Sequence, residues 1–133
     1  MAKTKKETKL TAEEPVFGAT FTFPPCNSRY APGNAWNNVA TGVNGTSGTI
    51  TGLPSFTSKY VAGWGQVSGP TTITIQFSND GFSSDIVDGN TVTTSGTQTT
   101  FGVYDLIPTG KTSARLKSSA NVTATAQIAE ITS

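Results

Sequence analysis

Three aspartates lie close together in the stretch NDGFSSDIVDGN: Asp80, Asp85 and Asp88. Carboxylate oxygens at this spacing could bind a calcium ion, and a facing pair could act as general acid and base on a glycosidic bond. The spacing differs from that of an EF-hand loop, however, and each aspartate stands next to Gly, Asn or Ser, where Asp commonly hydrogen-bonds the backbone of its own turn. We therefore expect these residues to stabilise turns, with a cation site and catalysis as the alternatives.

Other side chains that carry catalysis are scarce. The chain has no histidine, so a nucleophile of the Ser-His-Asp or Cys-His kind would lack its base. The single cysteine, Cys26, follows two prolines and is expected to be a small packed side chain and not a reactive thiolate. Clusters of Cys and His, which zinc and iron–sulfur sites require, do not occur, and an intramolecular disulfide is impossible. We predict a protein that is not an enzyme and that has no metal and no cofactor.

Aromatic side chains are the remaining candidates for a ligand or interface site. Tyr30 and Trp36 fall in the irregular stretch 26–48, among Asn, Gly and Pro, where they could stack on a sugar ring or enter a subunit interface. Trp36 is the better candidate for exposure. Tyr60 and Trp64 share one face of a predicted strand, and we expect both to pack in the core.

The first 14 residues form a basic arm that precedes a domain over residues 15–133. Four of the nine basic residues lie among the first nine positions, against one acid, Glu7, so these nine residues carry a net charge of +3. The basic residues are Lys3, Lys5, Lys6 and Lys9. Two interpretations stay open: a solvated tail, or an arm that orders against a neighbouring subunit and makes weak contacts to nucleic-acid phosphates.

Short strands are the elements that must position these residues. Thr, Ser, Gly and Asn are abundant and only 13% of residues are charged, a composition typical of strands with uncharged faces and tight turns. Alternation and turn signals at regular spacing predict seven or eight strands and no helix of two turns. The predicted strands are 17–23, 36–39, 59–67, 73–77, 90–94, 99–104, 113–117 and 121–128. We predict an all-β fold: a single antiparallel β-sandwich, jelly-roll-like or discoidin-like, with an extended N-terminal arm.

Two of these strands carry a further pattern. One ends in Ser78-Asn79-Asp80-Gly81 followed by Phe82, and another holds Ala114-Arg115-Leu116-Lys117. Between Thr71 and about Ser118 the chain resembles discoidin-like β-sandwich modules, and similar SNDG…RLK segments occur in small phage and bacterial virion-associated proteins. Phe82 replaces the usual Trp and no aromatic precedes Arg115, so the resemblance implies the sandwich and the virion association and leaves an inherited ligand site open. The Ser-Asn-Asp-Gly loop is then expected to be a corner of the sheet.

Two function classes follow. The first is a structural virion protein, a capsid decoration or minor capsid subunit that docks on the shell through its arm and sheet edges. Its expected partners are other capsid or virion proteins and further copies of itself. The alternative is a carbohydrate-binding or adhesive module. Neither a signal peptide nor an apolar run long enough for a membrane helix is visible, so we expect synthesis in a host cytoplasm, residence in the virion and no membrane partner.

Overall fold

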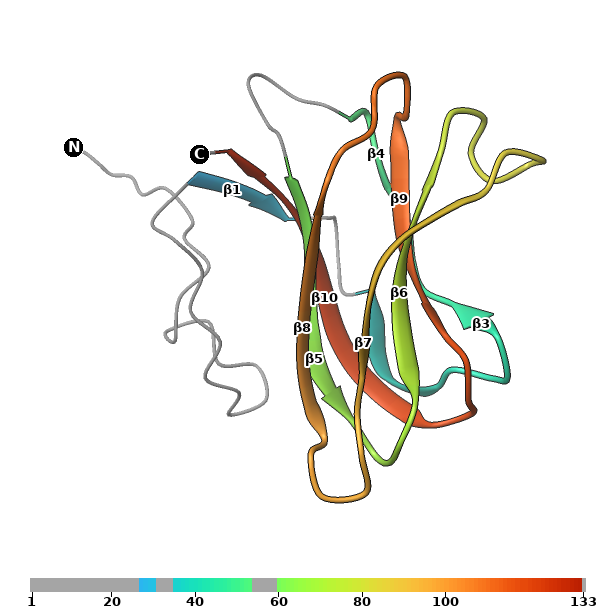
Figure 1. Cartoon of the computed structure of the whole chain (residues 1–133), viewed down its shortest axis with the longest axis vertical. Helices are drawn as coiled ribbons and strands as arrows, with labels where there is room; N and C mark the ends of the chain where they lie inside the picture. The colour runs from blue at the N-terminus through green and yellow to red at the C-terminus, as the bar shows by residue number, and fades with distance from the viewer. Residues whose placement is uncertain (1–26, 31–34, 54–59, 133) are drawn as a thin grey trace.

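A computed structural model of the chain describes residues 27–30, 35–53 and 60–132, and every regular element among them is a strand (Figure 1). The predicted strand 17–23, the four lysines of the arm and Cys26 lie outside the described residues. The strands are β1 (Asn27–Tyr30), β2 (Trp36–Ala40), β3 (Gly45–Thr46), β4 (Ile50–Thr51), β5 (Tyr60–Val67), β6 (Thr72–Ser78), β7 (Val87–Thr93), β8 (Thr100–Leu106), β9 (Ser113–Ser118) and β10 (Thr123–Thr132).

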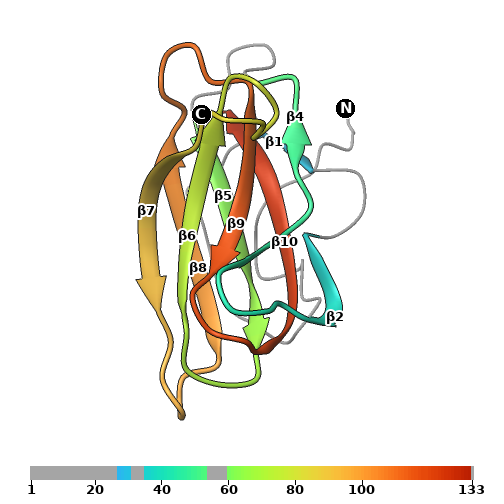
Figure 2. The same cartoon turned by 90° about the vertical axis from the view of Figure 1, so that its right-hand side faces the viewer.

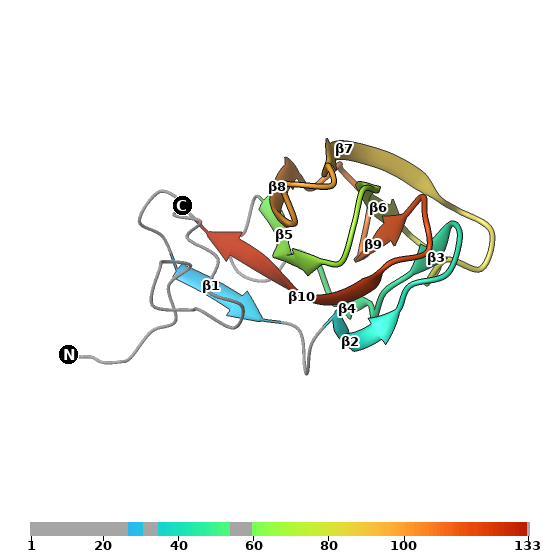
Figure 3. The ribbon, with the colours of Figure 1, turned by 90° about the horizontal axis from the view of Figure 1, so that it is seen from below.

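The strands form two antiparallel sheets that pack face to face (Figures 1 and 3). Sheet A has the order β1-β10-β5-β8, with β2 also paired to β10, and sheet B has the order β3-β9-β6-β7, with β4 also paired to β9. The pairings nest inward along the chain: β2 with β10, β4 with β9, β5 with β8 and β6 with β7. Successive pairs fall in opposite sheets, which is the arrangement of a jelly roll. The prediction of an all-β antiparallel sandwich is confirmed.

The strand predictions agree with the structure except at the sheet edges. β1, β3 and β4 are absent from the predicted strands, β7 begins three residues before the predicted start at residue 90, and β10 extends beyond residue 128. The extra residues of β10 pair with β1 and β5. Edge strands such as β1 and β3 form through backbone hydrogen bonds to a neighbour, which the side-chain alternation of a single strand does not reveal.

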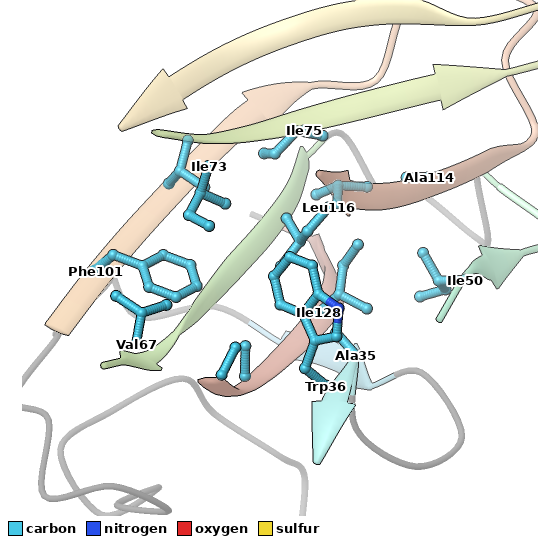
Figure 4. Packing of buried hydrophobic residues seen from close by; sticks show 14 of the residues in the cluster. Ala35, Trp36, Ile50, Val67, Ile73, Ile75, Phe101, Ala114, Leu116 and Ile128 are labelled. Atoms are coloured by element: carbon cyan, nitrogen blue, oxygen red, sulfur yellow. The ribbon is translucent and has the colours of Figure 1, made fainter. Parts of the chain in front are cut away.

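The hydrophobic core lies between the two sheets (Figure 4). Alternation in β6 places Ile73, Ile75 and Phe77 inward, and all three are fully buried, as predicted. Leu116 of β9 reaches across to β5, where a Cβ atom on Gly63 would lie only 2.7 Å from its Cδ2 atom. Glycine at this position therefore sets how closely the two sheets approach.

β7 and β8 lie beside each other at one side of the sandwich (Figure 2). Side-chain hydrogen bonds join the two strands. The backbone N–H of Asn90 donates to Asp105 Oδ2 at 2.9 Å, and the Asn90 side chain donates to the Tyr104 carbonyl at 2.8 Å. These bonds tie the edge strand of sheet B to that of sheet A. On the opposite side, the strands that the structure describes are the short edge strands β1, β2, β3 and β4.

Candidate functional site

The loop that follows β6 is organised around the carboxylate of Asp80. Ser78 Oγ donates to Asp80 Oδ1 at 2.9 Å, and the backbone N–H groups of Ser83, Ser84 and Asp85 donate to the same carboxylate at 3.1–3.2 Å. The hydroxyl of Ser84 adds a further bond of 2.9 Å. The carboxylate thus closes the loop onto its own backbone, and the prediction of turn stabilisation at Asp80 is confirmed.

The other two predicted aspartates face different partners. Asp85 Oδ2 accepts a hydrogen bond from Lys111 Nζ at 2.7 Å and one from the backbone N–H of Asn79 at 2.8 Å. Asp88 accepts one from the Gln76 side chain at 2.8 Å. Among the described residues no three or more Asp, Glu, His or Cys side chains are grouped so that they could hold a metal ion. Each of the three carboxylates is thus engaged by donors of the protein itself.

The hydrogen bonds at the loop favour the charged form of two of its carboxylates. Donation by Ser78 and then by Ser84 holds the pKa of Asp80 well below its ordinary range, and the hydrogen bond from Lys111 lowers the pKa of Asp85. A carboxylate whose pKa is lower in the folded state stabilises the fold above its unfolded pKa, about 3.9, and loses that contribution as the pH falls through the folded pKa. The loop should therefore weaken in acid.

Replacing Asp80 with asparagine should lower the melting temperature at pH 7 and flatten its fall on acidification between about pH 4 and pH 2. The variant keeps the size of the side chain but offers one acceptor oxygen where the carboxylate offers two to its several donors. Asp88→Asn, which affects an acceptor for a single side chain, is the matched control and should change the melting temperature less. Two results would show that the Asp80 carboxylate does not organise the loop. One is an equal drop in melting temperature at pH 7 in the two variants, and the other is a fall of the melting temperature in acid that is the same in Asp80→Asn as in wild type.

A polar network covers part of the outer face of sheet B next to this loop. The Arg115 guanidinium lies 3.9 Å from the centre of the Phe82 ring, and its Nε atom donates to Gln76 at 2.9 Å. Phe82 itself has a φ of +68°, which is unusual for a residue other than glycine. Phe82, one of the two departures from the discoidin-like pattern, thus contacts Arg115, and this contact fastens the loop to the sheet.

The structure places both tryptophans differently from their predictions, although both are buried. Trp36, expected to be exposed, is 4% exposed and belongs to the core between the sheets (Figure 4). It begins β2 opposite Ala126, whose side chain is also in the core, so the ring points inward. Trp64 is buried but lies outside that core, on the outer face of sheet A, while Tyr60 is only partly buried. Trp36 is therefore not accessible for stacking on a sugar.

The other predicted aromatic, Tyr30, is the last residue of β1 and pairs with Ala129 of β10. Its side chain lies outside the described part of the chain, as do the side chains of Lys3, Lys5, Lys6 and Lys9. The structure therefore places the backbone of Tyr30 at an edge of sheet A and leaves its predicted ligand or interface role as a prediction.

An apolar patch that the sequence analysis missed lies on the outer face of sheet A. Tyr104 and Leu106 of β8 are 53% and 57% exposed, and the Tyr104 ring meets the Tyr60 ring edge-on, with 5.9 Å between ring centres. Register places Leu106 directly opposite Tyr60. The signal was present in TFGVYDL, where Phe101 and Val103 alternate with Tyr104 and Leu106. We call Tyr60, Tyr104 and Leu106 the β8 patch.

Within the described ranges, no helix has the length and apolar character that crossing a bilayer requires. The protein is a jelly roll with a polar network on one outer face and an exposed apolar patch on the other. Comparison of the chain with protein-family models, curated proteins and solved structures gives no match.

Proposed function

We propose that this protein is a structural subunit of a virion, a capsid decoration or minor capsid protein that docks on its neighbours through sheet surfaces and the N-terminal arm. The observation that carries the proposal is the β8 patch. Two large apolar side chains, Tyr104 and Leu106, each expose more than half of their surface on the same strand. Exposed apolar residues gathered in this way are typical of protein–protein contact sites, where Tyr is also enriched.

The sheet edges supply a second kind of contact. Among the strands that the structure describes, β2 pairs only with β10, and its residues after Trp36 are exposed. An edge strand of this kind presents backbone N–H and C=O groups that can pair with a neighbouring chain. Val39, which is exposed in β2, would add apolar contact to such pairing.

The jelly-roll order supports the same proposal by analogy only. Double-sheet jelly rolls occur in viral capsid proteins, and they also occur in lectins. Fold alone does not determine function, so this likeness adds to the surface argument and does not replace it. The lysines of the arm, at positions 3, 5, 6 and 9, would provide the electrostatic part of docking.

The proposal predicts that the double replacement Tyr104→Ser with Leu106→Ser weakens docking on purified particles about thirtyfold or more, since central apolar anchors dominate such interfaces. Affinity is measured by cosedimentation of the purified chain with particles stripped of it. Val43→Ser is the matched control, because Val43 is 72% exposed but lies in a turn away from the patch. Equal affinity of the double variant and wild type would contradict docking through the β8 patch.

A further inference from the structure

The outer face of sheet A contains apolar side chains that are buried although they point away from the core. They are Ala62 and Trp64 of β5 and Ala129 and Ile131 of β10. Register pairs Ala62 with Ala129 across the two strands, and their neighbours Gly63 and Ile128 face the opposite way, into the sandwich. These four residues, which we call the β5–β10 face, therefore form a second apolar layer behind sheet A.

The cross-strand neighbours of Trp64 give its side chain little cover. The Trp64 side chain is only 3% exposed, yet its cross-strand neighbours are Gln127 and Gly102. Glycine has no side chain that could pack against the indole ring. Side chains stand roughly perpendicular to a sheet, so their outer ends are covered only by a segment that lies over the sheet. The cover does not extend over β8, because Tyr104 and Leu106 on the same face are more than half exposed.

The sequence outside the described residues contains one segment with the composition of such a cover. Residues 1–14 are rich in charge, and 31–34 and 54–59 are short polar connections with a single phenylalanine between them. Residues 16–23, VFGATFTF, alternate Phe17, Ala19, Phe21 and Phe23 with Gly and Thr, which gives one strongly apolar side.

The position of the chain also fits. Three residues, 24–26, separate Phe23 from the start of β1, and β1 pairs with the same end of β10 that carries Ala129 and Ile131 (Figure 1). A short connection of this length keeps the segment at a high effective concentration beside the β5–β10 face. We propose that residues 16–23 of the same chain lie over the outer face of sheet A, with their phenylalanine side packed on Ala62, Trp64, Ala129 and Ile131.

The cover is independent of the virion proposal, because its test needs only the purified chain and no particle.

Thiol accessibility in the full-length chain tests the cover at one defined point. Ala62→Cys, in a Cys26→Ser background so that it carries the only thiol, should react with a small maleimide at least about tenfold more slowly than Leu106→Cys in the same background. Leu106 lies on the same face but is exposed, so it supplies the reference rate. Equal rates in the two proteins would overturn the proposal.

The covering segment is identified by a pair of full-length variants in the Ala62→Cys protein. Phe17→Asp with Phe21→Asp should raise the labelling rate to nearly that of Leu106→Cys, whereas Thr20→Asp with Thr22→Asp, which adds the same charge on the other side of the segment, should leave it slow. Circular dichroism checks that both remain folded, and Phe21→Ser replaces the double variant if it does not.

Two further results would overturn the proposal. A slow labelling rate in both phenylalanine variants would assign the cover to another segment. Protection of the Ala62→Cys thiol that disappears on dilution to monomer would show that the cover comes from a second copy of the chain.

Discussion

Replacing Phe77 with aspartate is expected to abolish folding. Phe77 is fully buried in β6, between its cross-strand partners Ala114 of β9 and Val87 of β7. A carboxylate at this position would have no partner in an apolar core, and an unpaired buried charge costs on the order of 5 kcal/mol or more, a large part of the stability of a domain of this size. Far-UV and near-UV circular dichroism of the purified variant should show loss of the sheet signal and of ordered aromatic packing.

Thr91→Asp is the control for this change. Thr91 lies on β7 opposite Thr74, its side chain is exposed, and aspartate there remains in water. Its free energy of unfolding should lie within about 1 kcal/mol of the wild-type value. A folded Phe77→Asp protein with wild-type spectra would show that the strand parity of β6, and with it the placement of the core, is wrong.

Replacing Gly65 with alanine is expected to lower the free energy of unfolding by about 3 kcal/mol or more. Gly65 lies in the middle of β5, and a Cβ atom there would collide with the carbonyl oxygen of Thr125 and lie 2.6 Å from the Cα atom of Ala126. Both contacts are to the backbone of β10, which is fixed by pairing on both sides, so neither can move without breaking the sheet. Urea denaturation measures the change.

The matched control is Gly69→Ala. Gly69 lies in the turn after β5, and a Cβ atom there would meet no atom within 4 Å. The free energy of unfolding of Gly69→Ala should therefore lie within about 1 kcal/mol of the wild-type value. Similar stabilities for the two alanine variants would contradict the close approach of β5 and β10 at Gly65.

The strands and the sandwich could be predicted because alternation and turn residues are local signals. In β6 only one face is apolar, so Ile73, Ile75 and Phe77 identify the core side unambiguously. β5 is different, since both of its faces are apolar or small. The core side of β5 carries Val61, Val67 and two glycines, whose place in the core depends on Leu116 approaching from the other sheet. That contact joins residues distant in the sequence, and this is why Trp64 was placed on the wrong face.

The candidate site was predicted in the same uneven way. Asp80 was predicted as a turn residue because its partners, Ser78 and Ser83–Asp85, are within five positions of it. The position of Trp36 depends on pairing with Ala126, some ninety positions later in the chain, and its burial could not be read from its Asn- and Gly-rich surroundings. The β8 patch was visible in the alternation, but its exposure depends on where the outer cover of sheet A ends.

The measurement that tests the virion assignment most directly is the content of purified particles. Virus particles are isolated by density gradient from cultures that produce the chain, and the protein is quantified by mass spectrometry against a capsid protein of known copy number. If the chain is a structural subunit, its ratio to that capsid protein should stay fixed through repeated gradients. The chain should be lost from particles when Tyr104 and Leu106 are both replaced by serine. Recovery of the wild-type chain only in the soluble fraction, with none sedimenting with particles, would contradict the assignment.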